Sequence, residues 1–139
     1  MKKILVVDDE KINLILAKRL LSDEYDVATA ESGQQALDFM ADNKVDLVLL
    51  DVKMNGMDGF EVMDKMKADA RFCRLPVIFL TADRREETES KCFEMGAMDF
   101  VSKPFVPVIM RHRIERTLEL EDYRQKSMLT DSLYNGNEG

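Results

Sequence analysis

The sequence has no tryptophan and only two cysteines and one histidine among its 139 residues. Two cysteines cannot build a disulfide framework, and one histidine cannot build a histidine-based zinc site. The apolar run that follows Met1 is too short for a signal peptide, and no stretch approaches the roughly 18 apolar residues of a membrane span. We therefore expect a cytoplasmic protein with reduced thiols.

Acidic residues outnumber basic ones by 27 to 20, which gives a net charge of −7. Binding to nucleic acid requires a basic face, so we expect no nucleic-acid partner for this segment, and we expect no membrane partner either. Hydrophobic residues make up 45% of the chain, a share that indicates a folded protein. The length suits one domain.

Short apolar runs alternate with amphipathic stretches along the chain. Three of the runs are strongly apolar: Ile4–Val7, Leu47–Leu50 and Val77–Leu80. Such runs are typical of strands that are buried on both faces of a parallel sheet. Weaker runs predict two more strands, at Val27–Ala30 and Phe100–Val101.

Helical patterns separate these runs and follow the last one. The predicted helices cover Ile12–Leu20, Ala36–Met40, Phe60–Met66, about 85–95, and a stretch that begins near Pro107. The fourth has almost no apolar face. Strand and helix thus alternate five times, which predicts an α/β fold: a doubly wound, parallel, five-stranded sheet of the (βα)5 type with helices on both faces.

The domain is expected to end near residue 122. The apolar seam of the fifth helix, which starts at Met110, reaches Glu121, and a charged residue there breaks the seam of a coiled coil. We therefore divide the chain into a domain of residues 1–122 and an extension of residues 123–139. The extension is expected to be a helical linker with a flexible tail from Asn135.

Groups that suit phosphoryl chemistry follow the ends of four predicted strands. Asp8 and Asp9 follow the first strand, Asp51 the third, Thr81 the fourth and Lys103 the fifth. Ligands of open α/β sheets bind at the carboxyl ends of the strands, so we expect these side chains to meet at one edge. Each residue alone has an ordinary explanation, such as a helix cap or a surface lysine. Their coincidence at four strand ends favours a functional site.

The three carboxylates would repel one another and raise some of their pKa values. A hard divalent cation resolves that conflict, because Mg²⁺ takes oxygen ligands from a few carboxylates, water and phosphate. The sequence therefore predicts a Mg²⁺ site at Asp8, Asp9 and Asp51, with Mn²⁺ as a substitute.

The chain resembles the receiver domain of two-component response regulators over about residues 2–121. The resemblance rests on four motifs: Leu5–Asp9, Leu49–Gly59, Leu80–Ala82 and Gly96–Phe105. It implies a flavodoxin-like sheet with strand order 2-1-3-4-5. It also implies a bacterial signalling module of a phosphorelay rather than an enzyme, with at most self-phosphorylation from small donors and slow self-dephosphorylation.

The resemblance assigns a role to each residue of the edge. Asp51 would be the phosphoacceptor, Thr81 would bond a phosphoryl oxygen, and Lys103 would pair with the same group. Phe100 would be the aromatic switch residue that moves with Thr81, and the switch would act on the surface of the fourth helix, fifth strand and fifth helix. The bond between Lys103 and Pro104 matches the cis peptide of the family.

The implied metal site adds the backbone carbonyl of Lys53 to Asp8, Asp9 and Asp51. Lys53 occupies a position at which receivers vary and which tunes the lifetime of the phosphoryl group. Asn55 stands where the family commonly has proline, which loosens the turn without touching the chemistry. The implied partners are a cognate histidine kinase or phosphotransfer protein, a C-terminal output domain or effector protein, and a second copy in a phosphorylation-dependent homodimer.

Two other functions are compatible with parts of the pattern. A haloacid-dehalogenase-type phosphohydrolase also uses Asp, Thr and Lys at strand ends with Mg²⁺. It needs a second Asp two residues after its nucleophile, where this chain has Lys53, and its nucleophile follows the first strand. A flavodoxin-like cofactor binder needs a phosphate-cradling loop after the first strand, where Asp8–Glu10 would repel a phosphate.

Overall fold

The computed structural model describes the backbone of residues 1–137 and the side chains of residues 1–128. Within that part, the strands form one sheet in the order β2-β1-β3-β4-β5, with all neighbours parallel. The strands are β1 (Lys3–Val7), β2 (Asp26–Ala30), β3 (Leu47–Asp51), β4 (Val77–Thr81) and β5 (Asp99–Ser102). The doubly wound α/β fold and its strand order are confirmed.

Helices separate the strands and follow the last one, as the sequence predicts. They are α1 (Lys11–Leu21), α2 (Gly33–Asp42), α3 (Gly59–Lys67), α4 (Glu86–Glu94) and α5 (Pro107–Asn137). Asp58 caps α3, since its side chain accepts a hydrogen bond from the Glu61 N–H. Within α4 only Cys92 is buried, which agrees with the weak apolar face of that helix. Gly96 follows α4 with a φ of 94°, a conformation that favours glycine.

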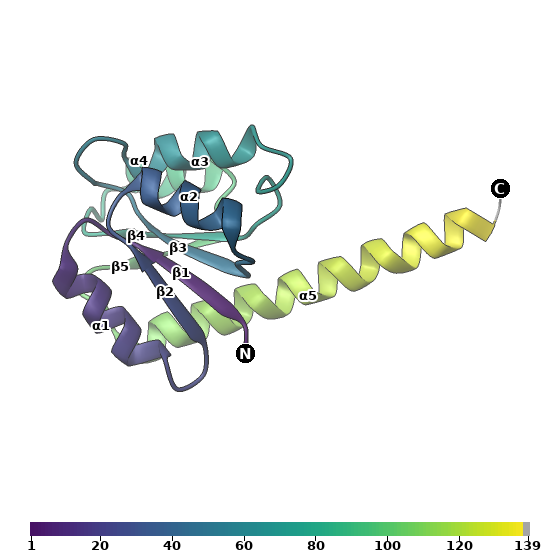
Figure 1. Ribbon diagram of the computed structural model, residues 1–139, viewed down its shortest axis with the longest axis horizontal. Helices are drawn as coiled ribbons and strands as arrows, with labels where there is room; N and C mark the ends of the chain where they lie inside the picture. Colours follow the sequence, from purple (N-terminus) through teal and green to yellow (C-terminus); the bar gives the residue numbers. More distant parts are fainter. Residues whose placement is uncertain (138–139) are drawn as a thin grey trace.

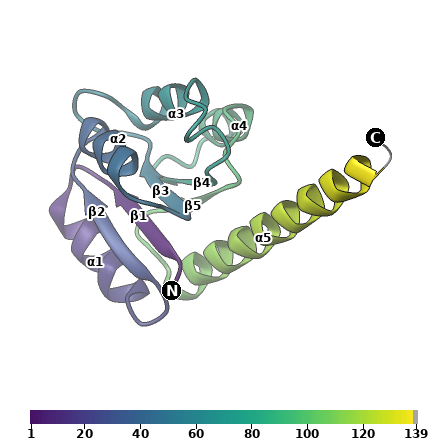
Figure 2. The same ribbon diagram turned by 45° about the vertical axis from the view of Figure 1, so that its right-hand side comes forward.

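Two apolar layers cover the sheet. Helices α2, α3 and α4 lie on one face, and α1 and α5 lie on the other (Figures 1 and 2). Successive side chains of a strand point to opposite faces, so Leu5 and Val7 pack in the first layer and Ile4 and Val6 in the second. The central strands β1, β3 and β4 are therefore held from both sides, and their carboxyl ends form a fixed edge.

Helix α5 continues well beyond the sheet (Figure 2). Its buried stripe runs through Met110, Ile114 and Thr117 to Glu121, which stays buried and accepts a hydrogen bond from Arg124 at 3.0 Å. The helix includes residues 135–137, which the sequence analysis assigned to a flexible tail, whereas residues 138 and 139 lie outside the described part. Within residues 1–137, no helix combines the length and hydropathy that crossing a membrane requires.

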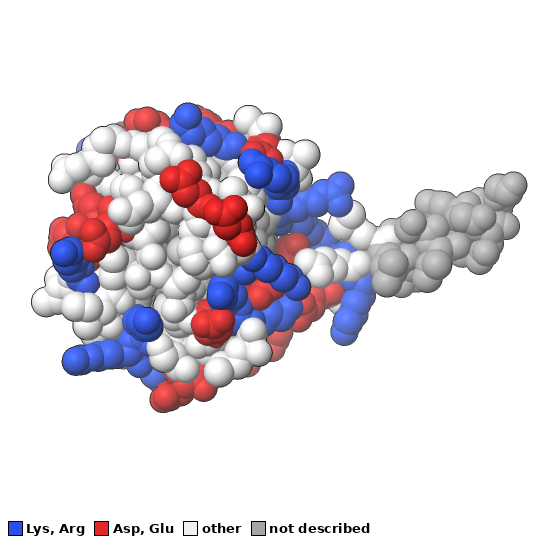
Figure 3. Space-filling model, viewed as in Figure 1, with Lys and Arg blue, Asp and Glu red and all other residues white. Residues whose placement is uncertain are grey.

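Charged side chains of both signs are interspersed on the face drawn in Figure 3. On that face no broad field of one sign stands out. The groups that suit phosphoryl chemistry follow the carboxyl ends of the strands.

Candidate functional site

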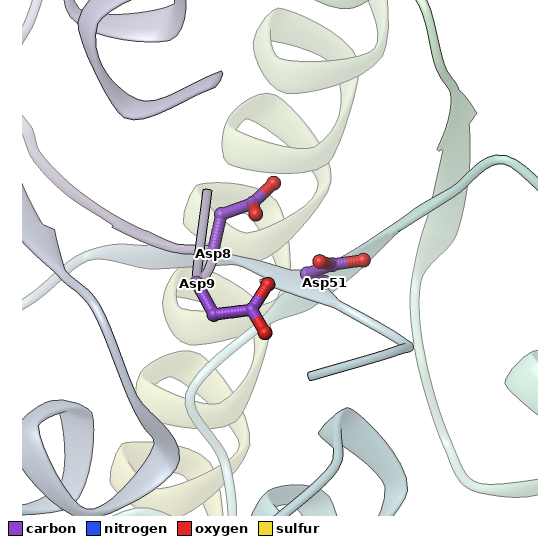
Figure 4. Close-up of side chains that lie close together, drawn as sticks. All are labelled: Asp8, Asp9 and Asp51. Carbon is purple, nitrogen blue, oxygen red and sulfur yellow. The ribbon is translucent and has the colours of Figure 1, made fainter. Parts of the chain in front are cut away.

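Three carboxylates meet at the carboxyl ends of β1 and β3 (Figure 4). One ligand oxygen from each of Asp8, Asp9 and Asp51 lies within 4.8 Å of the other two. Asp8 is 0% exposed and Asp51 is 4% exposed. The two strands are neighbours, with Val7 opposite Leu50, and the strand order reverses between them, which is where open α/β sheets bind ligands.

Lys103 brings a positive charge to the buried pair of acids. Its Nζ lies 2.8 Å from Asp8 Oδ2 and 3.0 Å from Asp51 Oδ2. The lysine follows β5 and is held there by its backbone N–H, which donates to the Thr81 carbonyl at 2.9 Å. The peptide bond between Lys103 and Pro104 is cis, as the family resemblance implies. One ammonium group thus forms ion pairs with two carboxylates.

Burial dominates the electrostatics of Asp51. Burial, which is the largest cause, and the charge of Asp8 raise the pKa of Asp51, whereas Lys103 lowers it; together they leave the pKa at about 7, against an ordinary value of 3.8. Burial lowers the pKa of Lys103, but its hydrogen bonds and charge interactions with Asp8 and Asp51 outweigh that effect and leave the pKa raised. The site thus holds excess negative charge, a condition that a bound cation would relieve.

Asp9 and the loop between β3 and α3 form the outer side of the cluster. The Asn55 N–H donates to Asp9 Oδ2 at 2.9 Å, which orients the Asp9 carboxylate. Lys53 lies in the same loop, is exposed, and lines the cavities beside the site. The role of its backbone carbonyl stays a prediction.

Thr81 ends β4 beside the cluster and is buried. Its hydroxyl accepts a hydrogen bond from the Asp83 N–H at 2.9 Å and lies 3.3 Å from the Asp83 carbonyl, to which it donates. The Asp83 carboxylate in turn accepts hydrogen bonds from Arg85 at 2.7–3.0 Å and from Thr88 at 2.8 Å. The hydroxyl is therefore engaged by its own loop.

Phe100 lies on β5, opposite Phe79 of β4, and is half-buried. Its ring packs edge-on against Phe93 of α4, with the ring centroids 5.7 Å apart. The Arg113 guanidinium of α5 lies 5.8 Å from the centroid of the same ring. Phe100 thus connects α4, β5 and α5.

The family model for the response regulator receiver domain matches residues 4–125. The chain belongs to that family. Receiver domains of known structure have the same fold: the chemotaxis protein CheY4 of Vibrio cholerae is 29% identical, with a TM-score of 0.80 over 84% of this chain and 98% of that one. NtrX of Brucella abortus is 32% identical, with a TM-score of 0.84 over 91% of this chain and 29% of that one.

Longer proteins contain a similar receiver domain. A probable cyclic di-GMP phosphodiesterase of Vibrio cholerae is 37% identical over 126 residues, which cover 91% of this chain and 28% of the relative. The response regulator PleD of Caulobacter vibrioides is 37% identical over 129 residues, which cover 89% of this chain and 28% of the relative. The chain spans between about a quarter and just over half of the curated relatives that it matches.

The receiver site also includes two residues that the sequence analysis missed. A cavity of about 870 Å³ is lined by Asp51, Thr81 and Lys103, and also by Asn13 and Arg85. Asn13 lies in the first turn of α1, five residues after Asp8. An asparagine at that position does not by itself predict a functional role. Arg85 lies in a loop of mixed charge. Their places in the site follow from tertiary structure.

Proposed function

We propose that this receiver domain accepts a phosphoryl group on Asp51 from a histidine kinase or phosphotransfer protein. The observation that carries the proposal is the buried Asp51 carboxylate, which lines a cavity and has Lys103 3.0 Å away and Asp8 beside it. The arrangement presents one nucleophilic oxygen next to a cation. It has the charges that phosphoryl transfer needs.

The reaction is an in-line displacement at phosphorus. An Asp51 oxygen forms the new P–O bond while the bond between phosphorus and the donor atom breaks, so the product is an acyl phosphate. A carboxylate rather than a carboxylic acid must attack. With a pKa of about 7, Asp51 is partly protonated near neutral pH, and Lys103 favours its ionised form. The Thr81 hydroxyl would bond the transferred group.

The residues present fit a Mg²⁺ site. Three hard oxygen donors lie within 4.8 Å of one another, and Asp9 is held in place by Asn55. Asp8, Asp9, Asp51 and the Lys53 carbonyl would hold the ion, and Mn²⁺ would substitute for it. When bound, the metal would neutralise the charge that develops on the phosphoryl oxygens.

Phosphorylation would act on the surface of α4, β5 and α5. A phosphoryl group that binds the Thr81 hydroxyl competes with the bonds from that hydroxyl to Asp83, and so favours the state in which Thr81 has moved inward. Phe100 would follow, since it packs between Phe93 and Arg113. The phosphorylated surface would control an output domain, an effector protein or a second copy of the chain.

The proposal concerns a cytoplasmic signalling module. Residues 1–122 would be the module, and residues 123–139 would connect it to an output domain. Supporting observations are the long α5 and relatives such as a probable cyclic di-GMP phosphodiesterase, in which the matched part is 28% of the whole. Its own activity would be limited to self-phosphorylation and slow self-dephosphorylation.

Asp51→Asn is expected to abolish labelling. Wild type incubated with Mg²⁺ and acetyl phosphate should gain the mass of one phosphoryl group, because a phosphoryl group on Asp51 could contact both Lys103 and Thr81. Intact-mass spectrometry measures the product. Asp38→Asn, an exposed change on α2, is the control and should label like wild type. Undiminished labelling of Asp51→Asn would contradict the assignment, and many turnovers per protein would favour a phosphohydrolase.

Phosphoryl binding is expected to change amide hydrogen exchange in residues 83–105. The segment contains the loop that holds the Thr81 hydroxyl, helix α4 and Phe100, so a shift of Thr81 must be transmitted through it. Exchange measured by mass spectrometry with and without beryllofluoride, a phosphoryl mimic, tests this prediction. The β2–α2 segment serves as the internal control. Identical exchange in residues 83–105 would exclude the switch in this chain.

A further inference from the structure

Asn13 is the one side-chain amide among the described residues that bonds an acid of the cluster. Its Nδ2 donates to Asp8 Oδ2 at 3.1 Å and lies 3.5 Å from Glu10 Oε2. Both neighbours are carboxylates, which only accept hydrogen bonds, so the NH₂ group rather than the carbonyl oxygen must face them. The first turn of α1 fixes the residue, since the Asn13 N–H donates to the Glu10 carbonyl at 3.1 Å.

The two oxygens of Asp8 have separate donors. Oδ1 accepts from the Glu10 N–H at 2.9 Å, while Oδ2 accepts from Asn13 and from the Lys103 ammonium. A carboxylate bonded at both oxygens cannot rotate without losing a bond, and a fully buried one has no water to replace the loss. The plane of Asp8 is therefore set from two sides.

The orientation of Asp8 determines the place of Lys103. The ammonium bridges Asp8 Oδ2 and Asp51 Oδ2, so a turn of Asp8 moves the anchor that keeps Lys103 beside the nucleophile. Without Asn13, Oδ2 would retain Lys103 as its one protein donor among the described residues, and the ammonium would be drawn toward Asp8. Partners that orient ligands in this way typically change metal affinity or activity by roughly 10–100-fold.

We infer that Asn13 is a positioning residue, which holds the Asp8 carboxylate so that Lys103 stays between Asp8 and Asp51 and the three acids stay arranged for a divalent cation. The inference rests on the proposed function for its kinetic part. Its metal-binding part can be measured without any phosphoryl transfer.

The test compares Asn13→Leu with Asn43→Leu. Asn43 is a matched control, because its amide makes one bond of similar length, 3.0 Å to the Phe39 carbonyl, at the exposed end of α2. Mn²⁺ binding is followed by the paramagnetic resonance of the free ion. Asn13→Leu should bind Mn²⁺ roughly tenfold more weakly than wild type, and Asn43→Leu should bind it as wild type does. Asn13→Gln, which retains the amide, should recover part of the affinity.

Labelling by acetyl phosphate separates positioning from donor binding. Asn13→Leu should lower the maximal labelling rate roughly tenfold and leave the half-saturating donor concentration unchanged. Wild-type Mn²⁺ affinity in Asn13→Leu, or a raised half-saturating concentration with an unchanged maximal rate, would overturn the inference. Absence of labelling in wild type would contradict the proposed function instead, and the Mn²⁺ comparison would still decide the role of Asn13.

Discussion

Asp51→Asn is expected to unfold at a higher temperature than wild type at pH 8 in EDTA. Asp51 has a pKa of about 7 in the folded protein and 3.8 as the reference for the unfolded chain. A raised carboxylate pKa means that ionisation opposes folding. Each pKa unit corresponds to about 1.4 kcal/mol, so the full effect is about 4 kcal/mol. For a domain of this length that is a rise of roughly 10 °C.

The pH dependence gives the sign of the effect. Between pH 3.8 and about 7 the folded protein binds more protons at Asp51 than the unfolded chain, so this group lowers the stability of wild type as the pH rises through that window. The destabilisation is absent below the window and complete above it. The difference in melting temperature between Asp51→Asn and wild type should therefore be small near pH 4 and largest above pH 7.

Mg²⁺ provides the control. A ligand that binds only the folded state adds about 2.7 kcal/mol when its concentration is 100 times its Kd. Wild type should gain more from Mg²⁺ than Asp51→Asn, because the variant lacks one of the three carboxylates. Equal gains would place the metal elsewhere. A melting-temperature difference that does not vary with pH would contradict the electrostatic explanation.

Gly59→Ala is expected to destabilise the protein and impair labelling of Asp51. Gly59 opens α3 directly beneath the end of β3, where its N–H donates to the Val52 carbonyl at 2.9 Å. A Cβ at Gly59 would lie 2.2 Å from the Asp51 carbonyl oxygen. Backbone cannot rotate away as a side chain can, so either α3 or the phosphoacceptor must move. Overpacking of this kind typically costs about 1–3 kcal/mol, and here we expect the upper end.

Gly56→Ala is the matched control for Gly59→Ala. Gly56 has a φ of 75° with open space around its Cβ position, and Gly59 lacks a positive φ. Alanine at Gly56 should cost about 1 kcal/mol from backbone strain and leave Asp51 in place. Urea unfolding and mass spectrometry of the labelled proteins compare the two. Equal stability and equal labelling of the two variants would show that the approach of α3 to Asp51 imposes no constraint.

The strands and the acid cluster could be predicted because their signals are local. Runs such as Ile4–Val7 are apolar throughout, as strands buried on both faces must be. For β5 the sequence predicts only Phe100–Val101, whereas the strand spans Asp99–Ser102. The apolar signal is short because β5 is an edge strand in which only Val101 is buried. The alternation of strand and helix indicates a parallel sheet, but strand order came from the family resemblance.

The remaining features of the site depend on tertiary contacts. Nothing local distinguishes Asn13 from a polar residue on the exposed face of α1. The ion pair between Arg85 and Asp83 lies in a loop, where no sequence periodicity predicts it. Gly59 has an ordinary backbone conformation, and what excludes a larger side chain there is the backbone at the end of the neighbouring strand. Sequence reasoning identified the groups that can carry the chemistry. The contacts that support those groups arise only when the chain is folded.

Helix α5 would fix the orientation, about the helix axis, of any segment joined beyond it relative to the receiver domain. Its first turns are anchored in the sheet layer by Met110 and Ile114, and the same helix continues to Asn137 without interruption. Each added residue advances an α-helix by about 1.5 Å and turns it by about 100°. Inserting one residue after Tyr123 would therefore point an attached domain in another direction, whereas seven residues would nearly restore it. The number of residues in α5 specifies an angle as well as a distance.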